Sequence, residues 1–144
     1  MTVNAVQPTF LRDMHSEFLA NGRTLRLYSL DSTHTYTLTD AFLSDIVAGD
    51  RINFVTLANP VTEIVDPGDG TADAVRVDAD DASTANGNAF AAASGRTCGG
   101  FVTVYWTGTE ATSHLGRFFA IADTAMDGGL DFLVNANGVM RIVQ

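Results

Sequence analysis

The residues best suited to chemistry in this chain are three carboxylates within four positions, Asp78, Asp80 and Asp81. Carboxylate oxygens are the ligands that Ca²⁺ prefers in proteins. A calcium loop also needs a glycine turn and a distal bidentate glutamate, and this segment has neither. The same reasoning applies to the aspartates around the Pro-Gly turn, which are Asp66, Asp69 and Asp73. We therefore expect solvated turns at both places and no metal site.

A second set, Ser113, His114 and Asp123, contains the residue types of a serine hydrolase. The sequence has no Gly-x-Ser-x-Gly nucleophile elbow, however. The remaining histidines are His15 and His34. We interpret His114 as a surface residue between two strands, and we expect no catalytic residues and no enzyme activity.

The cysteine and glycine patterns also give no indication of a cofactor site. Cys98 is the single cysteine, so it forms no disulfide within the chain, and no Cys/His cluster of the zinc-binding type surrounds it. The glycine pairs are Gly68 with Gly70 and Gly99 with Gly100. Neither pair is expected between a strand and a helix, which is where glycines cradle a phosphate.

Two neighbouring aromatic residues, Tyr105 and Trp106, fall in the most β-like segment of the chain. Consecutive side chains of a strand point to opposite faces. One of the two is therefore expected in the core, and the other at an interface or a ligand contact, where tyrosine and tryptophan are favoured.

Charge and composition exclude several classes of partner. The 144 residues carry a net charge of −9, and all eight basic residues are arginine. Nucleic acids and anionic membranes both require cationic clusters, so neither is an expected partner. Apolar residues make up 46% of the chain, but no run approaches the ~20 residues of a membrane span. The first eight residues lack the basic start and apolar stretch of a secretory signal, so none is expected.

Helical spacing of apolar residues predicts a helix from Thr9 to Asn21. Alternation of Leu25, Leu27 and Ser29 with their neighbours then predicts a strand from Thr24 to Leu30. A short second helix is expected from Asp40 to Gly49, with Asp40 as its cap.

Seven further strands are expected, at residues 51–57, 61–65, 72–77, 101–107, 117–122, 130–134 and 139–143, with a weaker one at 89–92. An Asn-Gly turn at 135–138 would join the last two as a hairpin. Residues 78–100 read largely as a partly ordered loop insertion.

The predicted fold is mainly β: an antiparallel β-sandwich or barrel of about eight short strands with one N-terminal helix. Residues 1–8 are expected to form an N-terminal arm, and residues 9–144 a single β-rich domain with that helix. The arm contains Val3, Val6 and Pro8, which suit an extended segment that pairs as a strand with a neighbouring subunit.

The order of these features resembles a family of small structural proteins encoded with the head and tail genes of tailed bacteriophages. The segments that carry the resemblance are residues 24–31, 35–51, 75–81, 101–115 and 120–124. The most specific pieces are the turn Thr107–Ser113 and the step Asp78–Asp81. The chain departs from the family in longer stretches at 66–70 and 86–100.

The resemblance implies a virion component, most of all a capsid cement or decoration protein that binds the assembled head. Its expected partners are the lattice of the major capsid protein and copies of itself, with a trimer as one candidate. Its expected location is the virion, assembled in the bacterial cytoplasm. The alternatives are a phage tail or baseplate component, or a carbohydrate- or ligand-binding β-sandwich that uses Tyr105 or Trp106.

Overall fold

The fold is described from a computed structural model, which defines residues 8–65, 74–134 and 140–142. One α-helix, α1 (Pro8–Ala20), precedes the strands. The strands are β1 (Thr24–Asp31), β2 (Arg51–Thr56), β3 (Val61–Val65), β4 (Ala74–Asp78), β5 (Thr97–Trp106), β6 (His114–Ala125) and β7 (Met140–Ile142). Three single-turn 3₁₀ helices lie between strands: η1 (Leu43–Asp45), η2 (Ala48–Asp50) and η3 (Glu110–Thr112).

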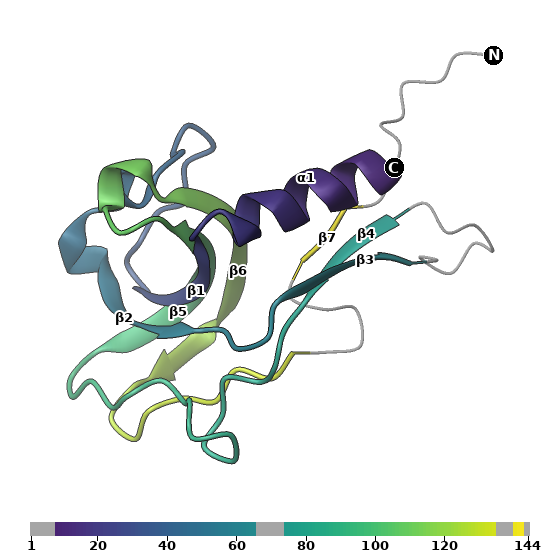
Figure 1. Cartoon of the computed structure of the whole chain (residues 1–144). Coiled ribbons are helices and arrows are strands. Elements are labelled where there is room, and N and C mark those ends of the chain that lie inside the picture. The colour runs from purple at the N-terminus through teal and green to yellow at the C-terminus, as the bar shows by residue number, and fades with distance from the viewer. Residues whose placement is uncertain (1–7, 66–73, 135–139, 143–144) are drawn as a thin grey trace.

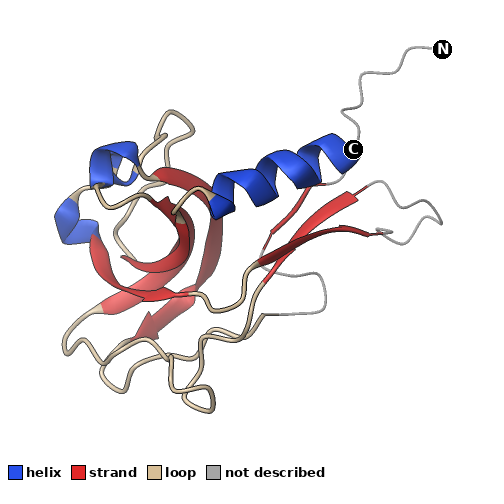
Figure 2. Cartoon of the chain, in the orientation of Figure 1, coloured by secondary structure: helices blue, strands red, loops and turns tan. Residues whose placement is uncertain are grey.

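The strands form two antiparallel sheets, in the order β2-β1-β5-β6 and β3-β4-β7. Figure 1 shows the four-stranded sheet strongly curled, with α1 running from it along the three-stranded sheet. More of the described chain lies in strands than in helices (Figure 2). The predicted mainly-β fold with one N-terminal helix is confirmed, and because the sheets are not closed it is sandwich-like rather than a barrel.

Strand β1 lies in the middle of the fold because both of its faces are apolar. Leu25 and Leu27 point to one face and Tyr28 and Leu30 to the other, and all four are buried. Hydrogen bonding on both edges, to β2 and β5, completes the burial. Such two-sided burial is typical of a central strand, and it divides the apolar interior into two cores.

The larger core lies on the Leu25 face of β1. Its buried members are Leu25, Leu27, Val55, Leu57, Val77, Ala79, Ala82, Phe90, Cys98, Phe101, Tyr105 and Met126. The smaller core lies on the opposite face, and its buried members are Tyr28, Leu30, Leu43, Ile46, Val102 and Val104. The second core explains why the segment after β1 folds back over the sheet, since it supplies Leu43 and Ile46.

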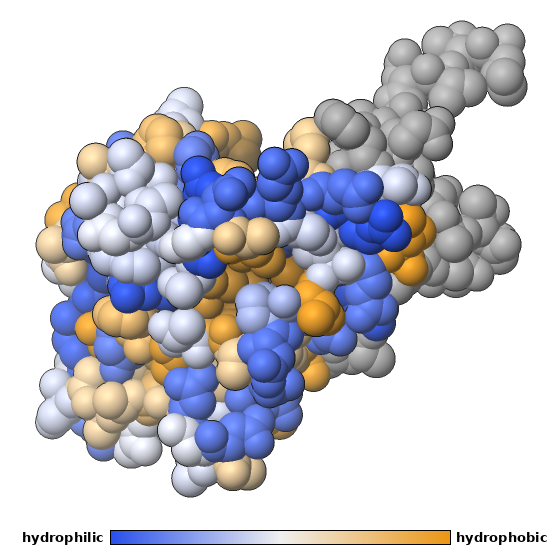
Figure 3. Space-filling view, viewed as in Figure 1, coloured by the Kyte–Doolittle hydropathy of each residue, from blue (hydrophilic) through white to orange (hydrophobic). Residues whose placement is uncertain are grey.

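Helix α1 begins at Pro8, one residue before the predicted start, because proline suits the first helical position. The predicted arm, apart from Pro8, lies outside the described residues. Helix α1 contacts β3 and β4, and Phe18 and Leu19 pack against the larger core. The outward side of the helix is largely hydrophilic (Figure 3).

The predicted helix from Asp40 to Gly49 is wrong, and the segment forms η1 and η2 instead. Its start is held extended by Leu43, whose N–H donates to the Ser113 carbonyl over 2.9 Å. The Asp45 carboxylate also accepts the N–H groups of Ala41 and Phe42, both at 2.9 Å. Phe42 is extended in a bridge to His114, and Ile46 is extended as well, so the chain between them has room for a single turn only.

Two other local predictions are corrected by pairing with distant segments. The weak strand at 89–92 is reduced to one bridge, between Phe90 and Leu130. The segment 130–134 bridges to Ala82 and Phe90, whereas β7 pairs with β4, so the predicted hairpin between them is not the observed pairing. Its turn, 135–138, lies outside the described residues. Strands β5 and β6 are both longer than predicted.

The curl of the four-stranded sheet is concentrated at Gly99 and Gly100 in β5. Cys98 pairs with Thr124, but Gly100 pairs with Ala120, so residues 121–123 bulge opposite Gly99 alone. A Cβ on Gly99 would lie 2.6 Å from the Ser32 Cα, and one on Gly100 would lie 2.5 Å from the Phe119 carbonyl oxygen. Both neighbours are backbone atoms, so only glycine fits without moving a strand.

We predict that Gly100→Ala lowers the free energy of unfolding by about 2–3 kcal/mol, since the added methyl group must displace the β6 backbone. Chemical denaturation monitored by circular dichroism measures this change. The matched control is Gly49→Ala, because nothing lies within 4 Å of a Cβ there. Equal stability of Gly100→Ala and the wild-type chain would contradict the close approach.

Candidate functional site

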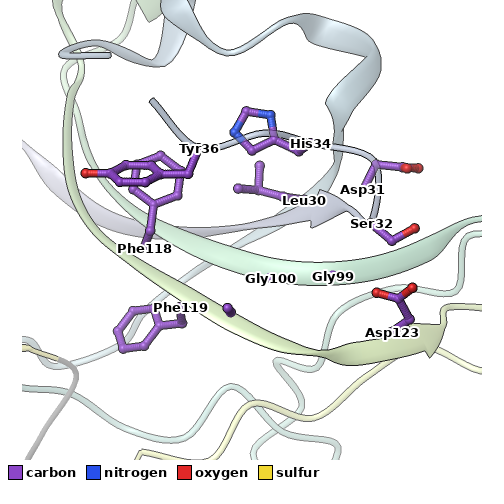
Figure 4. Close-up of a pocket in the computed structure, with 11 residues that line it drawn as sticks. Leu30, Asp31, Ser32, His34, Tyr36, Gly99, Gly100, Phe118, Phe119 and Asp123 are labelled. Carbon is purple, nitrogen blue, oxygen red and sulfur yellow. The ribbon is translucent and has the colours of Figure 1, made fainter. Parts of the chain in front are cut away.

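The candidate site is a pocket of about 140 Å³ where β1 ends over the bulge of β5 and β6. Its lining comes from β1, the following turn and both bulged strands: Leu30, Asp31, Ser32, His34, Tyr36, Gly99, Gly100, Phe118, Phe119, Ala120 and Asp123. Figure 4 shows aromatic side chains at one end, acidic and hydroxyl side chains at the other, and the two glycines between them. The pocket exists at this place because Gly99 and Gly100 leave its floor without side chains.

The aromatic end is built by Tyr36 and Phe118, whose ring centroids are 4.3 Å apart. Tyr36 is half exposed, whereas Phe118 packs against the smaller core. The ring of His34 lies nearly parallel to that of Phe118, with a centroid distance of 6.2 Å. This end therefore offers flat apolar surface to a molecule that enters from solvent.

The carboxylate of Asp50 holds the ring of His34 in place. Its Nδ1 lies 2.9 Å from Oδ2 of Asp50, and only 9% of its side chain is exposed. Its Nε2 is buried and has no hydrogen-bond partner in the described part of the chain. When the ring is neutral with the proton on Nδ1, Nε2 is an acceptor that lacks a donor.

The acidic end contains Asp31 and Asp123. Oδ1 of Asp31 accepts bonds from the backbone and hydroxyl of Thr33, at 3.1 and 2.8 Å, and Oδ2 lies 3.1 Å from Nε of Arg96. The hydrogen bonds from Thr33 and then those from Arg96 lower the pKa of Asp31. The exposed Asp123 has no hydrogen bond or ion pair to any described residue. One carboxylate is thus satisfied within the chain and the other is free.

The three clustered carboxylates point to different structural partners. Asp80 accepts a 2.6 Å bond from the Asn59 amide, and Asp81 accepts a 2.7 Å bond from the backbone N–H of Val134. Asp78 accepts the N–H of its neighbour Ala79 at 3.0 Å. Within the described ranges, no three His, Cys, Asp or Glu side chains lie close enough to hold a metal ion. Asp66, Asp69 and Asp73 lie outside those ranges, as do Gly68 and Gly70.

The hydrolase set is not assembled. The Ser113 hydroxyl is buried in its own turn, where it donates to the Thr109 carbonyl over 2.6 Å and accepts the N–H of Thr107 at 3.1 Å. His114 is exposed, as predicted, and begins β6, whereas Asp123 lies near the far end of the same strand. The three side chains therefore have separate surroundings and do not meet at one site.

Cys98 is fully buried, and its thiol donates to the Gly100 carbonyl at 3.2 Å. Burial is the main cause that raises the pKa of this thiol, and the nearby Asp31 raises it further. Because the thiolate is the reactive form, Cys98 is a core residue rather than a nucleophile.

Tyr105 and Trp106 divide between interior and surface as the sequence predicts. Tyr105 is buried, and its hydroxyl bonds Nε2 of His15. Trp106 is half buried, and the guanidinium carbon of Arg26 lies 4.0 Å from its ring centroid. Of the two aromatics named for ligand binding, Trp106 is the one within reach of solvent.

His15 joins three elements of the fold. Nδ1 of His15 on α1 lies 2.9 Å from the Thr62 hydroxyl on β3, while Nε2 bonds Tyr105 on β5. Burial lowers the pKa of His15. The sequence does not indicate a role for His15, because its hydrogen-bond partners lie 47 and 90 positions away in the chain.

The pocket itself could not be found from the sequence. His34 and Tyr36 lie between β1 and η1, whereas Phe118 lies in β6. The pairing of β5 with β1 and β6, including the register shift across Gly99, brings these residues to one place.

Comparisons with protein-family models, curated proteins and solved structures gave no match. Among the described residues, no helix has the length and apolar character needed to cross a membrane.

We predict that the protein loses stability as the pH falls below about 6.5, the ordinary pKa of histidine. The pKa of His15 is lower in the folded chain, so in that range the unfolded chain binds more protons and unfolding is favoured. Thermal melts between neutral and mildly acidic pH measure the slope. His15→Gln should flatten it, and the exposed His114→Gln should retain it. An unchanged slope in His15→Gln would contradict the assignment.

We also predict that millimolar Ca²⁺ or a chelator changes the melting temperature by less than about 1 °C. A ligand that binds only the folded chain would raise the melting temperature, but the carboxylates of Asp78, Asp80 and Asp81 are turned to separate partners. A drop of several degrees on chelation would contradict this prediction.

Proposed function

We propose that this chain is a structural protein of tailed-bacteriophage virions, and within that class a capsid cement or decoration protein. The observation that carries the proposal is that four of the five segments resembling that family pack into one unit, while the fifth, 75–81, lies in β4 and the loop after it. Strand β1, the turns after it, and the β5–β6 pair are all neighbours in the four-stranded sheet and its smaller core.

Direct contacts join two of the resembling stretches, 35–51 and the part of 101–115 from residue 107 on. The backbone N–H of Leu43 donates to Ser113, and that of Leu115 donates to Ala41, each over 2.9 Å. An ion pair of 2.7 Å between Arg51 and Glu110 adds to these bonds, and Arg51 lowers the pKa of Glu110. A shared order of segments that also forms a contiguous structure supports common descent of that unit better than scattered motifs would.

The same stretch presents apolar side chains to solvent. Leu38 is 87% exposed, Val47 67% and Tyr36 50%. Exposed apolar side chains on one segment are suited to a protein interface. A cement protein that binds only the assembled lattice stabilises that lattice by mass action, and several copies in an oligomer strengthen the binding further.

The first test is the composition of purified particles. Mass spectrometry of phage particles banded on a density gradient should detect this chain in the head fraction at a fixed copy number. Recovery only with isolated tails would favour the tail or baseplate alternative. Particles that lack the chain altogether would contradict the virion proposal.

The second test uses particles assembled without the chain, to which purified protein is added back. Wild-type protein should rebind and raise the temperature at which heads release DNA. Leu38→Asp should weaken binding by about tenfold, because burying a charge in an interface is unfavourable. The matched control is Leu133→Asp, since Leu133 is 67% exposed but lies beyond the resembling segments. Equal binding by the Leu38 variant and the control would contradict the role of this segment.

A further inference from the structure

The pocket at the bulge of β5 and β6 combines three features that the fold does not use. Asp123 is a free carboxylate at its rim, and the Ser32 hydroxyl beside it has no hydrogen-bond partner among the described residues. His34 lines the same pocket with a buried, unpartnered Nε2. Asp123 and Ser32 can accept a hydrogen bond, as can Nε2 of His34 when its proton is on Nδ1, and none of them receives one from a described residue.

A ligand that donates hydrogen bonds would satisfy these three groups. The nearby Asp31 is held ionised by Thr33 and Arg96, which lower its pKa. The Asp123 carboxylate has no cationic partner among the described residues and would repel an anion, so phosphate or a sugar acid is a poor fit. The described residues also gather no metal-binding group of three side chains. A cationic donor remains the best match.

The opposite end of the pocket indicates that the ligand must be long enough to reach both ends. Tyr36 and Phe118 present ring surface there, and Gly99 and Gly100 leave an unobstructed floor toward Asp123 (Figure 4). The volume of about 140 Å³ is close to that of a cavity that holds benzene. A long side chain with an apolar stem and a charged head fits this division of the pocket.

We propose that this pocket binds a basic side chain of a protein partner, with its stem along Tyr36 and Phe118 and its cationic head at Asp123. Charge complementarity identifies the partner surface as basic, since this chain has a net charge of −9 and no lysine. Aromatic rings at one end suit the apolar stem of arginine or lysine, and a carboxylate at the other end suits its charged head. The proposal holds whether or not the chain is a virion protein.

The test is a titration of the full chain with acetyl-Gly-Arg-Gly-amide, followed by NMR of the backbone amides. The amides of Ser32, Gly99 and Gly100 should shift saturably, with a dissociation constant on the order of 1 mM, as expected for one side chain. The same peptide with citrulline in place of arginine keeps the shape and loses the charge, and it should bind at least about fivefold more weakly. Equal binding of the citrulline peptide, or no saturable shift, would overturn the proposal.

Variants then locate the cation within the pocket. Asp123→Asn should weaken the arginine peptide about threefold to fivefold, the range of an exposed ion pair. Its fold should be unaffected, because the carboxylate has no partner in the described chain. Glu17→Gln removes one exposed charge from α1 and should bind as the wild type does. Identical affinities of the Asp123 and Glu17 variants would overturn the assignment of the cationic head to Asp123.

Discussion

The close backbone crossing at Gly99 and Gly100 is the constraint on which the rest of this structure depends. Side chains at these two positions would collide with backbone atoms of Ser32 and Phe119, at 2.6 and 2.5 Å. Without side chains, β5 can approach both the end of β1 and the inner edge of β6, and three residues of β6 bulge outward opposite Gly99. The strong curl of the sheet and the open pocket floor follow from this approach.

Hydrogen bonds from distant segments hold the remaining elements against that sheet. His15 ties α1 to β3 and β5, and the pairing of Leu43 with Ser113 closes the 3₁₀ turns over the smaller core. Most of the polar side chains that could take part in chemistry make structural hydrogen bonds of this kind. Ser113 braces a turn, Asp45 holds two backbone N–H groups, and Asp80 and Asp81 fix neighbouring loops. These side chains therefore stabilise the fold.

Three polar groups without partners among the described residues lie together. Asp123, Ser32 and the Nε2 of His34 surround one pocket, beside the segment that exposes Tyr36 and Leu38. A surface that offers acceptors, aromatic rings and exposed apolar side chains is suited to contact with a protein. The virion proposal and the basic-side-chain proposal draw on adjacent parts of this surface but rest on separate observations, so each can fail alone.

Local spacing was enough to predict the N-terminal helix, β1, β2 and β3, because periods of 3.6 and 2 depend on neighbouring residues alone. The mainly-β class followed from the number of predicted strands, and the net charge of −9 followed from the counts of charged residues. The 3₁₀ turns at 43–50, the pairing of 130–134 with 82–90, and the pocket were decided by tertiary structure. Each depends on a hydrogen bond or close approach between residues dozens of positions apart: Leu43 with Ser113, Phe132 with Ala82, and Gly99 with Ser32. Such contacts form only when the strands are already paired in one register, and no local pattern specifies that register.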